Sequence, residues 1–230
     1  MKIHVCITTY NRIEQCINTL KMVEREFKDF EYSVSVIDDC TNSAKPLEIY
    51  CVMHGITYHR NAVNNGKKRH WVNANHVFHY ARLEEADYLV WLADDMEYEE
   101  GWFVNCMNEM KAGQFLVMNC FLDHRAYSSN WHRHPKKQQE GYFKDGIFDG
   151  CGILSKKALE RINYFVPPIH PKRWERNPLL SSGVGKWLTV NLDRIGIVSS
   201  QYITHDWDAS KSKMNGTDRA PHRKNRNEKK

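Results

Sequence analysis

The chain has 230 residues, and 41% of them are hydrophobic, which is enough for one compact domain with a substantial core. Its formal charge of +5 arises at the end of the chain, because residues 219–230 carry six Lys or Arg and one acid, leaving 27 basic and 27 acidic residues over 1–218. No apolar run is long enough to cross a membrane, and the N-terminal residues turn polar too early for a secretory signal, so we expect a soluble, cytoplasmic protein.

The seven cysteines are scattered and form no C-x-x-C pair. An odd number cannot all pair within one chain, so reduced thiols in the core are favoured over a disulfide framework or a zinc site. His132 and His134 are close enough in sequence to chelate zinc, but no further ligands stand near them.

Apolar, β-branched runs alternate along the chain with longer segments in which apolar residues recur at helical spacing. Strands are predicted at 3–9, 32–38, 56–60, 88–93, 114–120, within 146–162 and at 196–205. Helices are predicted from about residue 11 into the twenties and at 46–55, 67–83, 102–110, late in 146–162 and at 185–194. The alternation predicts a single-domain α/β fold with a mostly parallel central sheet, Rossmann-like in its first half.

Three of these strands end in polar residues, where the loops of an open α/β sheet bind ligands. Helix capping explains any one of these ends, but three along one sheet edge favour a nucleotide site. The polar ends are Thr8 to Arg12, Asp38 with Asp39, and Asp94 with Asp95. The last pair directly follows the apolar run Tyr88 to Leu92, and a divalent cation is one way to keep two neighbouring acids ionised there.

Four segments in order, "CITTYNR", "VSVIDDC", "RNAVNNGKKRHWVNANHVFHYA" and "YLVWLADDM", resemble the nucleotide-sugar half of GT-A-fold glycosyltransferases of the family 2 type. The resemblance covers roughly residues 1–105. It implies a GT-A-like catalytic domain over 1–218, with the nucleotide-sugar half at 1–105 and an acceptor half at 106–218. From their charge, residues 219–230 are expected to form a basic, disordered tail.

The resemblance also implies roles for individual residues. Thr8 and Tyr10 would line the nucleotide pocket together with Arg12, and Asp39 would accept a hydrogen bond from a uracil-like base. Asn65, Gly66 and Lys67 match the segment beside the ribose and diphosphate, and Asn75 matches a recurrent helix asparagine. Lys67 is equally well explained as a solvated lysine.

A metal site follows from the same resemblance. Asp94 would face the ribose or the metal, Asp95 would bind Mn²⁺ or Mg²⁺ directly, and His205 would complete the site. The usual family motif has a further Asp where Ala93 stands, so the motif is shortened here to one pair. The bound metal would neutralise the departing diphosphate.

The sequence does not identify the general base that would deprotonate the acceptor hydroxyl. Asp149 is the first choice, since it precedes glycines in a segment similar to the family's acceptor-side loop, and Asp145 and Glu175 are alternatives. If no acid lies near the acceptor, a retaining mechanism becomes the better hypothesis.

The sequence also leaves more than one class of sugar acceptor possible. The chain is similar to bacteriophage-encoded glycosyltransferases, some of which modify hydroxymethylated pyrimidines in DNA, and the basic, aromatic segment 123–145 and the tail fit that acceptor. If the chain is phage-encoded, its compartment would be the host cytoplasm. A polysaccharide, lipid-linked sugar or protein acceptor is the alternative. Two rivals are a nucleotidyltransferase, whose glycine-rich N-terminal signature is missing here, and a non-catalytic DNA-binding accessory protein.

Overall fold

A computed structural model describes residues 1–120, 151–169, 183–192, 195–198, 200 and 202–205 of the chain. Within them a seven-stranded sheet has the order β3-β2-β1-β4-β7-β6-β8, and only β7 runs against its neighbours. Its strands are β1 (Lys2–Thr9), β2 (Glu31–Asp38), β3 (Thr57–Arg60), β4 (Tyr88–Ala93), β6 (Val117–Asn119), β7 (Gly152–Ser155) and β8 (Ile195–Ile197). Two short strands, β5 (Met96–Tyr98) and β9 (Ile203–His205), pair separately.

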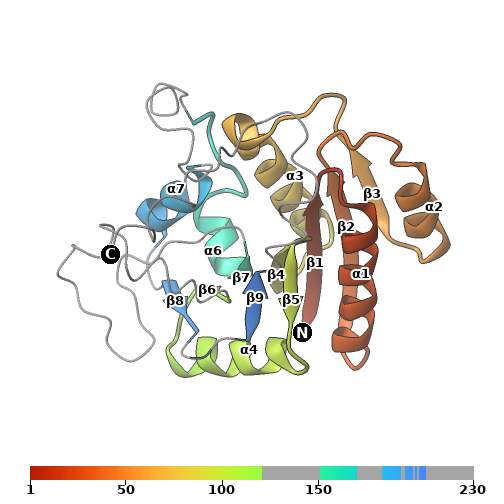
Figure 1. The fold of residues 1–230 in the computed structure, drawn as a ribbon. Coiled ribbons are helices and arrows are strands. Elements are labelled where there is room, and N and C mark those ends of the chain that lie inside the picture. The colour runs from red at the N-terminus through yellow and green to blue at the C-terminus, as the bar shows by residue number, and fades with distance from the viewer. Residues whose placement is uncertain (121–150, 170–182, 193–194, 199, 201, 206–230) are drawn as a thin grey trace, which may run out of the picture.

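Helices cover both faces of this sheet, as Figure 1 shows. Successive residues of a strand point to opposite faces, so Val90 and Leu92 of β4 enter one core while Leu89 and Trp91 enter the other. The first core is closed by α1 (Ile13–Phe27), α2 (Lys45–Met53) and α4 (Trp102–Ala112), and the second by α3 (His70–Leu83), α6 (Lys156–Arg161) and α7 (Val184–Asn191). A short 3-10 helix, η1 (Lys67–Arg69), precedes α3.

The predicted α/β alternation with a mostly parallel sheet is confirmed, and one predicted element is wrong. Residues 196–205 do not form one strand: the first part belongs to β8 in the large sheet, and the last part forms β9, which pairs with β5. β5 itself was not predicted. Three-residue strands carry too little periodicity to be recognised, and pairing with a distant partner decides them.

All seven cysteines are reduced, and six of them are buried, as the sequence predicts for core thiols. Among the described helices, none combines the length and the apolar character that spanning a bilayer requires.

The core contains one histidine that should make the fold sensitive to acid. His4 on β1 is 1% exposed, and its ring nitrogens lie 2.9 and 2.8 Å from the hydroxyls of Ser33 and Ser35 on β2. Burial lowers the pKa of His4 to about 4, so the imidazole stays neutral in the folded protein. Because the unfolded chain takes up this proton near the ordinary pKa, stability is lost as the pH falls from about 6.5 towards 4.

We expect the buried His4 imidazole to lower the free energy of unfolding by roughly 2 kcal/mol when the pH falls from about 7 to about 5. Urea denaturation at both pH values should therefore show a smaller acid loss for His4→Gln than for the wild type. The matched control is His79→Gln, which removes an exposed histidine and should keep the wild-type loss. Equal losses in His4→Gln and wild type would contradict the assignment.

Candidate nucleotide-sugar site

The turn after β1 directs Arg12 towards the end of β4. Asn11 has a φ of 54°, a left-handed conformation that asparagine tolerates better than most residues. Its N–H donates to Thr41 Oγ1 at 2.8 Å, and its Oδ1 accepts from the Asn42 N–H at 2.9 Å, so the loop after β2 holds the turn in place. Helix α1 begins immediately afterwards, with Arg12 as its N-terminal capping residue.

Two carboxylates at the end of β4 share the guanidinium of Arg12. Its Nη1 donates to Asp94 Oδ1 at 2.8 Å and lies 2.9 Å from Asp95 Oδ2. The Thr9 hydroxyl donates to the second Asp94 oxygen, Oδ2, at 2.6 Å. The Asp94 side chain is 4% exposed and that of Asp95 is 16% exposed, so Asp95 is the more accessible acid.

The charges in this cluster depend on one another. Burial, helped by the charge of Asp95, raises the pKa of Asp94 to about 6, even though Arg12 and the Thr9 hydroxyl favour the ionised carboxylate. Burial also opposes the charge of Arg12, but Asp94 and Asp95 outweigh it and raise the pKa of the guanidinium. At neutral pH the three side chains therefore carry about one net negative charge.

Asp39, at the end of β2, is held by four hydrogen bonds. Its Oδ1 accepts from Asn61 Nδ2 at 2.9 Å, from the Asn65 N–H at 2.9 Å and from Asn65 Nδ2 at 3.1 Å, while its Oδ2 accepts from the Gly66 N–H at 2.8 Å. Asn61 Nδ2 also donates to Asn73 Oδ1 of α3 at 2.6 Å. Asn65 Oδ1 is buried and has no hydrogen-bond partner among the described residues. A ligand or a water can satisfy it.

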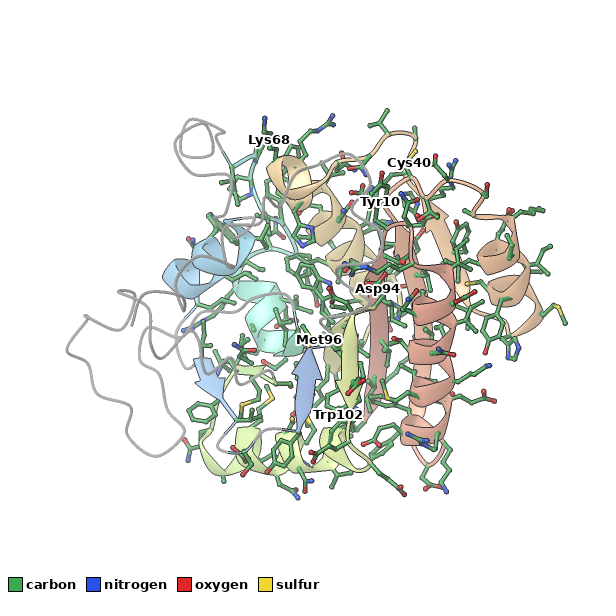
Figure 2. The ribbon with its side chains drawn as sticks, viewed as in Figure 1. Tyr10, Cys40, Lys68, Asp94, Met96 and Trp102 are labelled. Carbon is green, nitrogen blue, oxygen red and sulfur yellow. The ribbon has the colours of Figure 1, made fainter. Side chains whose placement is uncertain are left out.

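Strand β1 brings these two groups together. β2 and β4 flank β1 in parallel, so all three strands end at one edge of the sheet. The backbone oxygen of Thr9 accepts from the Asp39 N–H at 2.9 Å, and its hydroxyl contacts Asp94. Figure 2 labels Tyr10 and Cys40 near the top of the view and Asp94 below them, closer to the middle of the molecule.

His205 reaches the same region through the small sheet. In the antiparallel pairing of β5 and β9 its backbone lies opposite Met96, the residue that follows Asp95. The register therefore places the backbone of His205 next to the acid pair. Its side chain lies outside the described part of the structure.

Residues 4–162 match the sequence profile of "Glycosyl transferase family 2", which covers more than half of the chain. The chain belongs to this family. A search of curated proteins gives no match.

Solved structures share the GT-A fold of this family 2 chain at low sequence identity. One is TarS residues 1–349 from S. aureus in complex with UDP-GlcNAc, with a TM-score of 0.55 at 15% identity, over 88% of this chain and 58% of that one. Another is the mannosyltransferase PcManGT from Pyrobaculum calidifontis with GDP-Man and Mn²⁺, with a TM-score of 0.57 at 14% identity, over 86% and 56%. A third is GalNAc-T7 with UDP, GalNAc and Mn²⁺, with a TM-score of 0.59 at 12% identity, over 89% and 43%. The chain thus spans less than two thirds of each.

The acid pair has the donor chemistry that a divalent cation needs. Carboxylate oxygens are hard ligands, as Mg²⁺ and Mn²⁺ prefer. Among the residues that the structure describes, no three His, Cys, Asp or Glu side chains gather closely enough to enclose a metal alone. Both oxygens of Asp94 already accept hydrogen bonds, from Thr9 and Arg12. The acid pair therefore fits a divalent cation only as a partial ligand set, and the remaining ligands would have to come from outside the described residues.

Two further predicted site residues, Thr8 and Tyr10, lie at this edge. Thr8 is partly buried, with its hydroxyl 3.4 Å from Trp91 Nε1, and Tyr10 is 42% exposed at the rim. The backbone of Lys67 follows Gly66 into η1, but the Lys67 side chain is outside the described part. Asp149 also lies outside it, as do the alternatives Asp145 and Glu175, the segment 123–145 and the tail 219–230.

Sequence reasoning missed Asn61 and Asn73 as members of the site, and it named Thr9 only as part of a polar strand end, without a role of its own. Asn61 and Asn73 both stand within the segment "RNAVNNGKKRHWVNAN", and Asn73 lies on the otherwise apolar buried face of α3. An amide on such a face is a signal for a buried hydrogen-bond network.

Asn75 has a role in holding the fold. Its Nδ2 donates to the Val166 oxygen at 3.0 Å, and its Oδ1 accepts from the Val166 N–H at 2.7 Å. This pair of bonds ties the segment after α6 to helix α3.

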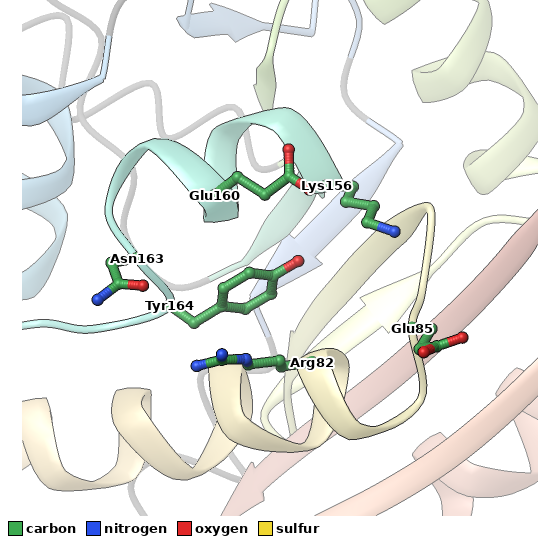
Figure 3. A pocket seen from close by; sticks show the side chains of 6 residues that line it. All are labelled: Arg82, Glu85, Lys156, Glu160, Asn163 and Tyr164. Atoms are coloured by element: carbon green, nitrogen blue, oxygen red, sulfur yellow. The ribbon is translucent and has the colours of Figure 1, made fainter.

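A pocket of about 400 Å³ lies away from this site (Figure 3). Its lining residue Lys156 donates its N–H to the oxygen of Asp87, just before β4 begins, whereas Asp94 follows the end of β4. Six strand residues span roughly 20 Å, so the pocket sits at the opposite end of the sheet. It is lined by Arg82, Glu85, Lys156, Glu160, Asn163 and Tyr164.

Proposed function

We propose that this chain transfers a sugar from a nucleotide sugar, with UDP-sugar as the favoured donor, to a hydroxyl acceptor, and that it needs Mn²⁺ or Mg²⁺. The observation that carries the proposal is the position of Thr9. Its backbone contacts Asp39 and its side chain contacts Asp94. The carboxylate proposed to bind the nucleotide base and the acid pair proposed to bind the metal therefore lie on either side of one strand end. A nucleoside diphosphate has its base at one end and its phosphates at the other, which matches this arrangement.

Different residues of the site would bind different parts of the nucleotide-sugar donor. Asp39 is held by Asn61, Asn65 and Gly66 so that its carboxylate can accept a ring N–H from the base, and Asn65 Oδ1 is an unsatisfied acceptor for a ribose hydroxyl. Asp94 and Asp95, with His205 as the third candidate ligand, would hold the divalent cation. When bound, the cation acts as a Lewis acid on the diphosphate leaving group.

Proton removal from the acceptor falls to another residue. Both acids after β4 are already engaged by Arg12, which lowers their value as a general base. Asp149 remains our candidate for this role. The position of Thr8 near the end of β1, and of Tyr10 just after that strand, supports their contact with the nucleotide.

A thermal-shift screen tests the donor. UDP-sugars with Mn²⁺ should raise the melting temperature by about 5–10 °C at a concentration near 100 times Kd, because a ligand that binds only the folded state stabilises it by about 2.7 kcal/mol. Each sugar is compared with and without Mn²⁺, and with GDP-mannose as the rival donor. No shift with any nucleotide sugar and metal would contradict the proposal.

The acceptor is tested with the donor that this screen selects. Transfer of radiolabelled sugar is measured to duplex DNA containing 5-hydroxymethylated pyrimidines, to the same DNA without the hydroxymethyl group, and to polysaccharide, lipid-linked and protein acceptors. We name hydroxymethylated DNA because segment 123–145 interleaves aromatic and basic residues and the tail is basic. If radiolabelled sugar appears only in the polysaccharide, lipid-linked or protein acceptors, DNA is excluded as the acceptor. DNA binding without any transfer would favour an accessory protein.

A further inference from the structure

The ion pair of Arg12 is placed where the local structure disfavours a cation. Arg12 caps the N-terminus of α1, and the positive end of a helix dipole lies there. Its side chain is only 16% exposed, so much of its hydration is lost as well. Two carboxylates at 2.8 and 2.9 Å from a single nitrogen, Nη1, compensate for both costs. The site thus has its own cation between the acids proposed to hold the metal.

We propose that Arg12 is an internal counter-ion that makes the divalent-cation affinity of Asp94 and Asp95 depend on a bound nucleoside diphosphate. This inference rests on the proposed metal-dependent function. It assigns Arg12 a role as a positioning residue, distinct from the direct nucleotide contact that the family resemblance implies.

The argument is one of charge balance. Two carboxylates without Arg12 would offer a dication two negative charges, whereas with Arg12 the cluster offers about one. A free metal ion must then bind close to a guanidinium that repels it. A diphosphate brings further negative charge and oxygen ligands, so the metal and the nucleotide should bind together much more tightly than the metal alone.

Mn²⁺ binding followed by electron paramagnetic resonance tests this without turnover. The Kd of Mn²⁺ is measured with and without saturating UDP for the wild type, Arg12→Gln and Arg12→Lys. For Arg12→Gln we expect at least about tenfold tighter binding of free Mn²⁺ and a smaller effect of UDP. Arg12→Lys keeps a positive charge and should stay within about threefold of the wild type.

Arg82→Gln is the matched control. Arg82 lies in the last turn of α3, with its guanidinium over the Tyr164 ring, at the end of the sheet away from Asp94 and Asp95 (Figure 3). Its replacement also removes one positive charge, and it should leave the Kd of Mn²⁺ unchanged. Melting temperatures establish that each variant is folded. If Arg12→Gln does not fold, the wild-type measurements still test the inference. It requires Mn²⁺ to bind the wild type at least about tenfold more weakly without UDP than with UDP, and equal Kd values would overturn it.

The outcomes separate the two proposals. Free Mn²⁺ binding that is equal or weaker in folded Arg12→Gln would overturn the role of Arg12 while leaving the metal-dependent function standing. Wild-type protein that binds no Mn²⁺ even with UDP would instead overturn the metal site itself, and the inference with it.

Discussion

Replacing Asp95 with asparagine is expected to lower the rate of sugar transfer at least about 100-fold while the protein stays folded. Asp95 is the more exposed acid of the pair, it is the second residue after β4, and it lies next to Met96, which pairs with His205. Asparagine keeps the shape of the side chain but removes the charge that a divalent cation needs. The measurement is turnover of the donor over a range of Mn²⁺ concentrations.

Glu100→Gln provides the matched control for this experiment. It removes one exposed acid from the loop before α4, and its turnover and Mn²⁺ dependence should equal those of the wild type. The melting temperature of Asp95→Asn should stay close to the wild-type value, because Arg12 keeps its hydrogen bond to Asp94. Turnover of Asp95→Asn comparable to the wild type would remove Asp95 from the proposed metal site.

Replacing Asp39 with alanine should cost both stability and donor binding. Asp39 is 6% exposed and accepts four hydrogen bonds, from Asn61, from the backbone and side chain of Asn65, and from Gly66. Each buried donor left without an acceptor costs about 1–3 kcal/mol, so we expect a loss of at least about 3 kcal/mol. For a chain of this size that corresponds to a fall in melting temperature of roughly 6–12 °C.

Asp39→Asn separates the two effects. It fills the same volume and keeps one oxygen for the network, but it offers N–H groups where a base N–H needs an acceptor. Calorimetry should therefore show UDP binding weakened in Asp39→Asn with a smaller loss of stability than in Asp39→Ala. Asp29→Ala, which removes an exposed acid, should change neither quantity. Wild-type UDP affinity in Asp39→Asn would show that Asp39 serves the fold alone.

The order of strands and helices was predictable because each longer element carries its own pattern. Strand β4 is an apolar run of strand length, and α3 repeats its apolar residues at helical spacing, with Ala74, Val77, Phe78 and Ala81 all buried. The short pair β5 and β9 was not predictable. Its residues pair across more than 100 positions, and three residues are too few to show a period.

The sequence alone determined that acids and polar side chains stand at the ends of three strands, since strand boundaries and residue types are local properties. Only the tertiary structure decided which of these groups meet. Asp94 and Arg12 are 82 positions apart, and the parallel pairing of β1 with β4 brings them within 2.8 Å. No local pattern distinguishes an arginine that points to solvent from one that bridges two buried carboxylates. That choice depends on the left-handed turn at Asn11 and on the desolvation of Asp94, both of which exist only in the folded chain.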